Sequence, residues 1–301
     1  MAVIVTEGLT RGYGKRPGIV DLDLSVEEGA LYGFLGPNGA GKTTTIRVLL
    51  GFLRANSGRA RVFGLECFPE SHRIKAEVGY LPGDVRLYPW MTGELALRLF
   101  GRIRGRDLRA AGKELAEDLE LDLGVKVRQM SRGMRQKLGL ILTLAPDPRL
   151  LVLDEPTSGL DPLTQEKLLR RLRGMTGAGH TVFFSSHVLR EVEELCDRVA
   201  IIRAGRLVVE AGIEALRAKA AREVEIRFRG GIPANLEPPP YLAVSARGPS
   251  TLAGRLAGPV GPLLEWLQGK PVEDLRIERP DLESLFRSYY ASPETVNQTL
   301  P

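Results

Sequence analysis

Cysteine is scarce in this sequence, with only Cys67 and Cys196 among 301 residues. Two cysteines cannot build a disulfide framework, and their spacing matches no metal-binding motif. A small protein held together by disulfides or by structural zinc is therefore excluded. We expect both thiols to be reduced, as they are in cytosolic proteins.

Long hydrophobic runs are missing too. A helix that spans a bilayer needs about 20 apolar residues, whereas stretches such as residues 138–145 are short and flanked by charge or proline. Residues 1–7 carry no basic residue ahead of their apolar ones. We therefore expect neither a transmembrane segment nor a signal peptide.

The charge is dispersed, and no concentrated basic run is present, although the net charge is +5 and the pI is about 9.3. This balance is compatible with an anionic membrane surface, a nucleotide or a nucleic acid, and we interpret it as a generally solvated basic surface. With 43% hydrophobic and 26% charged residues, the composition is globular. It allows one large domain and one small one.

The most informative stretch is residues 36–44, which read Gly-Pro-Asn-Gly-Ala-Gly-Lys-Thr-Thr and contain the pattern G-x-x-x-x-G-K-[ST]. An apolar run of strand length, residues 30–35, precedes it, and a helical pattern over residues 45–50 follows it. A strand, a glycine-rich loop and a helix in this order predict a phosphate site.

The residue types explain the chemistry of this loop. Gly36, Gly39 and Gly41 allow backbone conformations that side chains forbid, so that successive N–H groups form a nest for an anion. The helix that follows adds its positive N-terminal end. Lys42 supplies a charge for the β- and γ-phosphates, and Thr43 offers a hydroxyl to Mg²⁺, which prefers oxygen ligands.

Residues 149–156 indicate a second part of the same site. Four apolar residues end in Asp154 and Glu155, which predicts a buried parallel strand with two carboxylates at its C-terminal end. Ligands of open α/β sheets bind at that end. Two carboxylates at the end of a buried strand are costly unless they have a function.

Two further residues allow more than one interpretation. His187 ends another predicted buried strand, residues 181–187; such a histidine is often only a structural hydrogen-bonding group, but its place beyond the Asp154-Glu155 strand favours a catalytic role. Tyr13 lies in a predicted turn, and its ring either stacks on adenine or is an ordinary turn aromatic.

The remaining pattern predicts the organisation of the chain. Residues 3–9 and 19–26 read as strands of an antiparallel sheet, and Ser131 is a good N-cap for a helix that runs to about residue 145. A domain boundary is expected near residue 220. Beyond it, strands at 224–228, 241–246, 251–256 and 272–277 and helices at 263–268 and 281–290 predict a small α+β unit, with a frayed tail from residue 291.

Together these motifs resemble the ATP-binding cassettes of ABC transporters, over about residues 1–215. The resemblance implies an α/β fold, namely a P-loop NTPase cassette with a mixed sheet core, an antiparallel β subdomain and a helical insertion at about 91–145. The small α+β accessory domain at 220–290 and the tail at 291–301 would follow. The family is one of ATPases, which implies ATP and Mg²⁺ as cofactors.

The resemblance also implies a role for each matching residue. Glu155 is similar to the general base for the attacking water, His187 to the switch that senses the γ-phosphate, and Asp154 to the acid that orients Mg²⁺ through water. Thr43 matches the Mg²⁺ ligand, and Tyr13 the aromatic that stacks on adenine. The implied ATP-binding loop comprises Gly36, Pro37, Asn38, Gly39, Ala40, Gly41, Lys42, Thr43 and Thr44.

Ser131 and Gly133 match the family's signature motif, and residues 158–161 match its D-loop. In this family two chains sandwich ATP, and each supplies the signature for the other's site. The resemblance therefore implies a homodimer or heterodimer of cassettes, and a monomer that hydrolyses ATP poorly.

Two departures from the family pattern stand out. The signature reads Met130-Ser131-Arg132-Gly133-Met134 instead of Leu-Ser-Gly-Gly-Gln, and the usual Q-loop glutamine falls at Gly83, which has no side chain. We hypothesise that Asp84 takes over the Mg²⁺ and water contacts from the next position.

Residues 79–82, 87–92, 131–134 and 281–286 also resemble cassettes of the ABC-2-type exporters. This implies an export ATPase at the cytoplasmic face of the cell membrane, bound to a separate transmembrane permease of the ABC-2 type. The loop at 83–90 and the helical insertion after it would form the docking groove. Leu87, Tyr88 and Trp90 either contact that permease or pack locally.

Three other functions are compatible with a cassette of this kind. A soluble cassette ATPase that acts on ribosomes or nucleic acid would have two cassettes, a long coiled coil or a zinc insertion; none is found in this sequence, so no nucleic acid partner is expected. The signature variant and the C-terminal unit argue against an importer. Intact Lys42, Asp154, Glu155 and His187 argue against an inactive regulatory cassette. Contacts with the transported substrate are expected in the permease.

Overall fold

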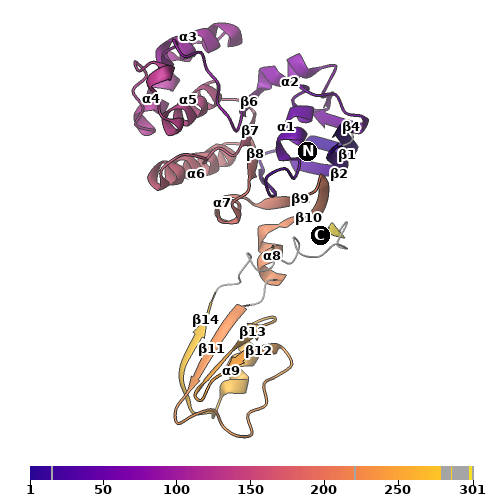
Figure 1. Cartoon of the computed structure of the whole chain (residues 1–301), viewed down its shortest axis with the longest axis vertical. Helices are drawn as coiled ribbons and strands as arrows, with labels where there is room; N and C mark the ends of the chain where they lie inside the picture. The colour runs from indigo at the N-terminus through magenta and orange to yellow at the C-terminus, as the bar shows by residue number, and fades with distance from the viewer. Residues whose placement is uncertain (15, 220–221, 279–285, 287–297, 300–301) are drawn as a thin grey trace. The chain divides into compact units, whose positions relative to one another are not determined.

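The computed structural model describes residues 1–14, 16–219, 222–278, 286 and 298–299, and these form two compact units. The first unit contains Met1–Glu210 together with residues 298–299, and the second begins at Ala211. This division falls earlier than the boundary predicted near residue 220, because helix α8 (Ile213–Lys219) groups with the second unit. Figure 1 shows the elements of each unit.

An antiparallel sheet in the order β2-β1-β4-β5 occupies one side of the first unit. Along β2, Leu22, Leu24 and Val26 are buried while the residues between them are exposed, which confirms the predicted half-exposed strand. Strand β1 is longer than predicted, because pairing with β2 continues as far as Tyr13 opposite Arg16. The strands are β1 (Ala2–Tyr13), β2 (Arg16–Glu27), β4 (Ser57–Val62) and β5 (Leu65–Glu66).

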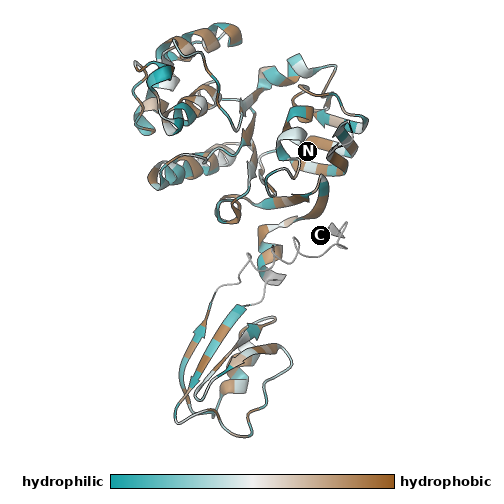
Figure 2. Cartoon of the chain, in the orientation of Figure 1, coloured by the Kyte–Doolittle hydropathy of each residue, from teal (hydrophilic) through white to brown (hydrophobic). Residues whose placement is uncertain are grey.

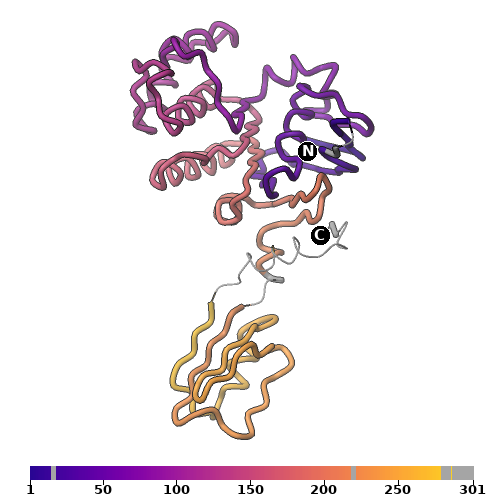
Figure 3. Tube along the Cα trace, in the orientation of Figure 1, coloured from indigo at the N-terminus to yellow at the C-terminus, as the bar shows by residue number. Residues whose placement is uncertain are grey.

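The central sheet has the order β15-β10-β9-β3-β8-β7-β6, with β3 paired in parallel to both β8 and β9. Strands β3, β7 and β8 are buried along their whole length, as strands covered on both faces are. The trace in Figure 3 leaves this sheet for the helices and returns to it. The strands are β3 (Leu31–Leu35), β6 (Val78–Leu81), β7 (Leu150–Asp154), β8 (Thr181–Ser186), β9 (Arg198–Arg203), β10 (Arg206–Gly212) and β15 (Gln298–Thr299).

The register of the central strands brings three sequence motifs to one edge. Leu35, which precedes the glycine-rich loop, pairs with Ser186, which precedes His187. Asp154 at the end of β7 pairs with Ser185 on β8. Parallel strands end at the same edge of a sheet, so the loop, the two acids and His187 lie close together.

The helices surround this sheet, and the helical insertion gathers on the side away from the antiparallel sheet (Figure 1). Bands of hydrophilic and hydrophobic residues run along these helices in Figure 2, as amphipathic helices require. Helices α2 and α6 were not predicted. The helices are α1 (Lys42–Leu49), α2 (Ser71–Glu77), α3 (Gly93–Arg104), α4 (Arg109–Asp118), α5 (Arg132–Leu144), α6 (Pro162–Gly177) and α7 (Leu189–Leu195), with a 3-10 turn at Val127–Gln129.

The second unit contains a four-stranded antiparallel sheet in the order β12-β13-β11-β14 and one helix, α9, whose Leu263 and Leu267 are buried. Its own core includes Val224, Ile226 and Phe228 of β11. The elements follow the predicted pattern: β11 (Arg222–Phe228), β12 (Leu242–Arg247), β13 (Thr251–Leu256), α9 (Gly261–Leu267) and β14 (Val272–Ile277).

The C-terminal segment is described only in part. The helix predicted at 281–290 lies outside the described residues apart from Phe286. The expectation of a frayed tail is wrong for Gln298 and Thr299, which pair in parallel with Val209 and Glu210 of β10. Across the described ranges, no helix combines the length and the apolar character needed to cross a bilayer.

Candidate functional site: a phosphate loop facing two acids

The glycine-rich loop connects β3 to α1, and its geometry requires glycine. Gly39 and Gly41 have φ angles of 81° and 112°, in the left-handed region. A Cβ atom at Gly41 would lie 2.5 Å from the carbonyl oxygen of Gly18, so only glycine fits there. The loop leads directly into the start of α1 at Lys42, where the sequence predicts an anion site.

Lys42 is only 5% exposed and lies between the loop and the acids. Its Nζ donates hydrogen bonds to the carbonyl oxygens of Gly36 at 2.6 Å and Pro37 at 3.3 Å. The same atom lies 3.4 Å from Oε1 of Glu155. The positive charge is therefore held where the loop meets the end of β7.

Asp154 is buried and joins three elements through its carboxylate. The Thr43 hydroxyl donates to its Oδ2 at 2.8 Å, and the Ser185 hydroxyl donates to its Oδ1 at 2.7 Å. Nearby, burial and, to a smaller extent, the Asp154 charge raise the pKa of Tyr80 to about 12. That phenol stays neutral beside the acid at physiological pH.

Glu155 lies beside both Lys42 and His187. Its Oε1 is 3.2 Å from Nδ1 of His187, whose side chain is 46% exposed. The backbone φ of Glu155 is 51°, a conformation that side-chain-bearing residues rarely adopt and that is often found at active sites. The carboxylate thus lies between a lysine and a histidine, close to the phosphate loop.

A pocket of about 400 Å³ is lined by loop residues Asn38, Gly39 and Gly41, by Lys42, Thr43 and Thr44 of α1, and by Glu155, Gly18 and Tyr13. Tyr13, at the end of β1, is 45% exposed, and its Oη lies 3.4 Å from Oγ1 of Thr44. The Arg11 guanidinium lies over the Tyr13 ring at 5.5 Å. The Tyr13 ring therefore lies at the edge of the pocket. Ala40, another residue of the loop, is buried and does not line the pocket.

Ser131 and Gly133 are not among the residues that line this pocket. Ser131 caps α5 by accepting a hydrogen bond from the Met134 N–H at 3.2 Å, as predicted. A Cβ atom at Gly133 would lie 2.7 Å from the carbonyl oxygen of Gly159, and Nη2 of Arg132 donates to Oγ of Ser158 at 2.8 Å. The start of α5 therefore packs on residues 158–159 of the same chain.

This packing gives a first prediction. Gly133→Ala forces the Gly159 carbonyl away, and we expect it to lower the free energy of unfolding by about 1–3 kcal/mol. Gly174 on α6 has open space around its Cα, so the matched Gly174→Ala should raise the free energy of unfolding by roughly 0.5–1 kcal/mol. Urea unfolding of both variants checks this, and equal effects of the two substitutions would contradict the packing argument.

The space at the Q-loop position faces Asp154, but Asp84 does not fill it. A Cβ atom at Gly83 would lie 3.6 Å from Oδ2 of Asp154. The Asp84 side chain is 73% exposed, and its Oδ2 accepts a hydrogen bond from Nε of Arg86 at 2.7 Å. Contrary to the hypothesis from the sequence, Asp84 is paired on the exposed loop and is not brought to Thr43 and Asp154.

We therefore expect Asp84→Ala to leave Mg²⁺-dependent ATP turnover within about twofold of the wild type, because an exposed ion pair contributes little. Steady-state turnover over a Mg²⁺ titration measures this. A raised Mg²⁺ requirement in the variant would restore the sequence-based hypothesis.

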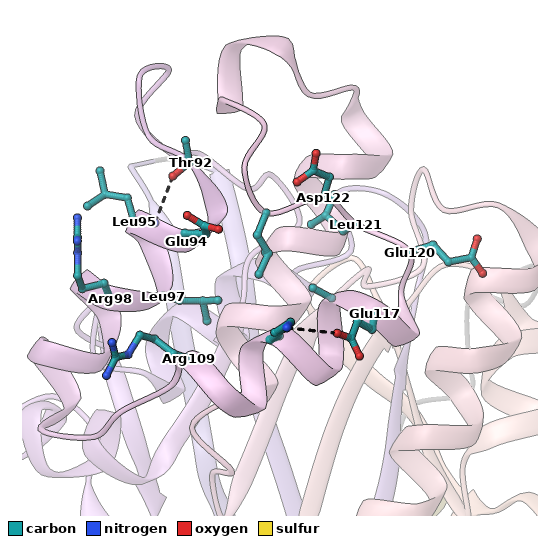
Figure 4. A pocket seen from close by; sticks show the side chains of 13 residues that line it. Thr92, Glu94, Leu95, Leu97, Arg98, Arg109, Glu117, Glu120, Leu121 and Asp122 are labelled. Atoms are coloured by element: carbon teal, nitrogen blue, oxygen red, sulfur yellow. Dashed lines mark hydrogen bonds and ion pairs between the residues drawn. The ribbon is translucent and has the colours of Figure 1, made fainter.

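A larger hollow, of about 740 Å³, lies in the helical insertion (Figure 4) and shares no lining residue with the pocket at the phosphate loop. It is lined by residues of α3, α4 and the segment 120–123. Both signs of charge surround it, including Glu94, Arg98 and Lys113, and Lys113 lies 3.9 Å from Glu117. Of the motifs singled out in the sequence, only the 87–92 stretch contributes to its lining, through Thr92.

Sequence reasoning missed Ser185 and Gly18 as parts of the site. Ser185 holds Asp154, and Gly18 lines the pocket. A small polar residue two positions before His187 was a usable signal for Ser185, because it directly follows Val182, Phe183 and Phe184 in a buried strand. Gly18 offered none, because its role depends on where β2 meets the loop.

Comparison with known proteins identifies the family of this chain. The family model described as "ABC transporter" matches residues 19–158. The Daunorubicin resistance ATP-binding protein DrrA3 of Streptomyces coeruleorubidus is 35% identical over 300 residues, which cover 94% of each chain. The chain belongs to the ATP-binding subunits of ABC transporters. It is therefore an ATPase cassette that binds nucleotide.

Other relatives agree with this assignment. The Bacitracin transport ATP-binding protein BcrA of Bacillus licheniformis is 36% identical over 229 residues, 75% of each chain. A solved "ATP binding subunit of ABC transporter" is 27% identical, with a TM-score of 0.67 over 71% of this chain and 92% of its own. A solved dimeric cassette bound to ADP and Pi has the same fold, with a TM-score of 0.63 and 22% identity. The match covers 70% of this chain and 98% of that chain.

Proposed function

We propose that this cassette energises export through a separate membrane-spanning permease, to which it binds at the cytoplasmic face of the cell membrane. The observation that carries the proposal is the match to a daunorubicin resistance protein over 94% of both chains. Such a match includes the second unit, whereas the family model ends at residue 158. A permease of the ABC-2 type is the expected partner.

The nucleotide site fits Mg²⁺ as a second cofactor. The Thr43 hydroxyl and the Asp154 carboxylate are 2.8 Å apart, and both offer the oxygen ligands that Mg²⁺ prefers while it keeps several waters. Thr43 would bind the ion directly, and Asp154 would hold it through water. When bound, the ion neutralises phosphate charge.

The remaining residues are assigned by what they can do chemically. The Glu155 carboxylate accepts a proton from the attacking water, and His187 beside it contacts the γ-phosphate. Lys42 and the loop from Gly36 to Thr44 hold the phosphates, while Tyr13 stacks on adenine. This division follows phosphoryl transfer in general, which depends on positioning and charge neutralisation more than on covalent chemistry.

A second cassette completes the site, because Ser131 and Gly133 do not line the pocket of their own chain. Two chains related by a two-fold axis would each offer the start of α5 to the other's phosphates. We expect specific turnover to rise with protein concentration and to fall toward zero on dilution to monomer. Turnover measured across a dilution series, with the mass of the complex followed in parallel, tests this; constant specific turnover in the monomer contradicts it.

The segment at 83–90 and helix α3 offer apolar groups for the permease. Tyr88 and Trp90 are 65% and 59% exposed and stack on each other with ring centres 5.7 Å apart. Ile103 on α3 is 82% exposed. Leu87 is half-buried, so of the three residues considered from the sequence it fits local packing best.

A pull-down from native membranes tests the whole proposal. Tagged Glu155→Gln would be held with Mg-ATP, and co-purification of a multi-span ABC-2-type membrane protein is the expected result. The same bait with Trp90→Ala should recover less permease, whereas Leu264→Ala, at an exposed leucine of the second unit, serves as the matched control. Recovery of ribosomes, DNA or soluble proteins alone would overturn the export proposal.

A further inference from the structure

Glu155 requires support from its surroundings. A residue with a side chain in the left-handed region is strained by about 1–2 kcal/mol, and Glu155 has a φ of 51°. Such a conformation persists only when neighbouring groups hold it. The direction of the Glu155 carboxylate therefore depends on the groups that fix its backbone.

Those groups bind Glu155 from two sides. Its N–H donates to the carbonyl oxygen of Ser185 at 3.1 Å and lies 3.3 Å from the Ser185 hydroxyl. On the other side, Nε2 of Gln136 donates to the carbonyl oxygen of Pro156 at 3.0 Å and lies 3.5 Å from that of Glu155. The amide is held by the central sheet, and the carbonyl groups by a helix.

Gln136 reaches this position from α5. Its side chain is 5% exposed, and a buried amide that donates to two successive carbonyls is a specific contact rather than a surface one. Gln136 lies in the second turn of the helix that Ser131 caps. Because a helix moves largely as a rigid body, a shift at Ser131 is passed on to Gln136.

We propose that Gln136 is a positioning residue for Glu155, and that it ties the direction of the catalytic carboxylate to the placement of helix α5. This inference rests on the proposed function, in which Glu155 is the base and the start of α5 meets a second cassette's nucleotide. Gln136 touches neither nucleotide nor water in this role. It acts through the backbone at 155–156, so that the base is aligned when α5 is correctly seated.

The test compares Gln136→Met with Thr143→Val in the full chain. Methionine keeps the length and helix preference of glutamine but donates no hydrogen bond. Thr143 is a buried donor on the same helix that binds carbonyl oxygens of Tyr80 and Gly139 instead. A displaced catalytic group costs up to about 100-fold in rate, so turnover of Gln136→Met should fall about 10- to 100-fold. Binding of a fluorescent ATP analogue and the unfolding temperature should stay near the wild type, and Thr143→Val should keep its turnover.

A double variant separates positioning from general damage. If Gln136 acts only through Glu155, adding Gln136→Met to Glu155→Gln should lower turnover by less than about twofold further. The inference would be overturned if the turnover of the double variant fell by the product of the two single-variant losses. Unchanged turnover in Gln136→Met would also overturn it. If Gln136→Met does not fold, Gln136→Asn, whose amide is one methylene too short, is measured in the same way with the same criteria. A wild-type dimer without Mg-ATP hydrolysis would instead contradict the proposed function.

Discussion

Replacing Glu155 by glutamine is expected to lower ATP turnover by about 10²- to 10⁴-fold while nucleotide binding is retained. The carboxylate lies 3.4 Å from Nζ of Lys42 and 3.2 Å from Nδ1 of His187. Glutamine keeps the shape and the hydrogen-bonding oxygen but cannot take a proton from water. Single-turnover hydrolysis of radiolabelled ATP, measured beside equilibrium binding, separates the two effects.

The control for this variant is Glu166→Gln, the same substitution at an exposed ion pair with Arg170 on α6. It should leave hydrolysis within about twofold of the wild type. Because Glu155→Gln binds ATP without hydrolysing it, the variant should also remain longer as a two-cassette complex in Mg-ATP. Hydrolysis at the wild-type rate would show that another group is the base.

The central features of the fold could be predicted because their residue types allow few alternatives. The strands predicted at 30–35 and 181–187 became β3 and β8, and the glycine-rich loop between β3 and α1 has the left-handed glycines that its pattern requires. Glu155, directly after β7, lies beside Lys42, as parallel strands ending at one edge dictate. Helix α6 was missed, although Asp161 caps it and Pro162 begins it, which are usable start signals.

The parts that could not be predicted depend on contacts between distant residues. Nothing local indicates that Gln136 reaches the carbonyl of Pro156. The position of Ser185 in a buried strand could be noticed, but its bond to Asp154 follows from strand register. The structure does not bring Asp84 to the predicted Mg²⁺ position for a different, local reason: Arg86, two residues along the exposed loop, binds its carboxylate. The sequence therefore predicted the candidate reactive residues more completely than the residues that orient them.

Replacing Lys42 by methionine is expected to lower hydrolysis by about 10²- to 10³-fold, the usual cost of removing one preorganised electrostatic group. Unlike Glu155→Gln, this variant should also bind ATP more weakly, because Lys42 supplies the positive side-chain charge that meets the phosphates in the proposed site. Methionine retains the apolar stem, which matters because the side chain is 5% exposed. Nucleotide titration followed by hydrolysis measurements at saturation resolves the two losses.

Lys167→Met provides the comparison for Lys42, because Nζ of Lys167 also binds a carbonyl and a carboxylate, those of Asp118 and Glu120, but far from the loop. ATP hydrolysis by Lys167→Met should equal that of the wild type. Lys42→Arg should not restore activity, because the rigid guanidinium fork cannot replace a compact ammonium group between the carbonyls of Gly36 and Pro37. Tight ATP binding by Lys42→Met would show that the loop backbone and α1 hold the phosphates alone, with Lys42 acting on the transition state rather than on binding.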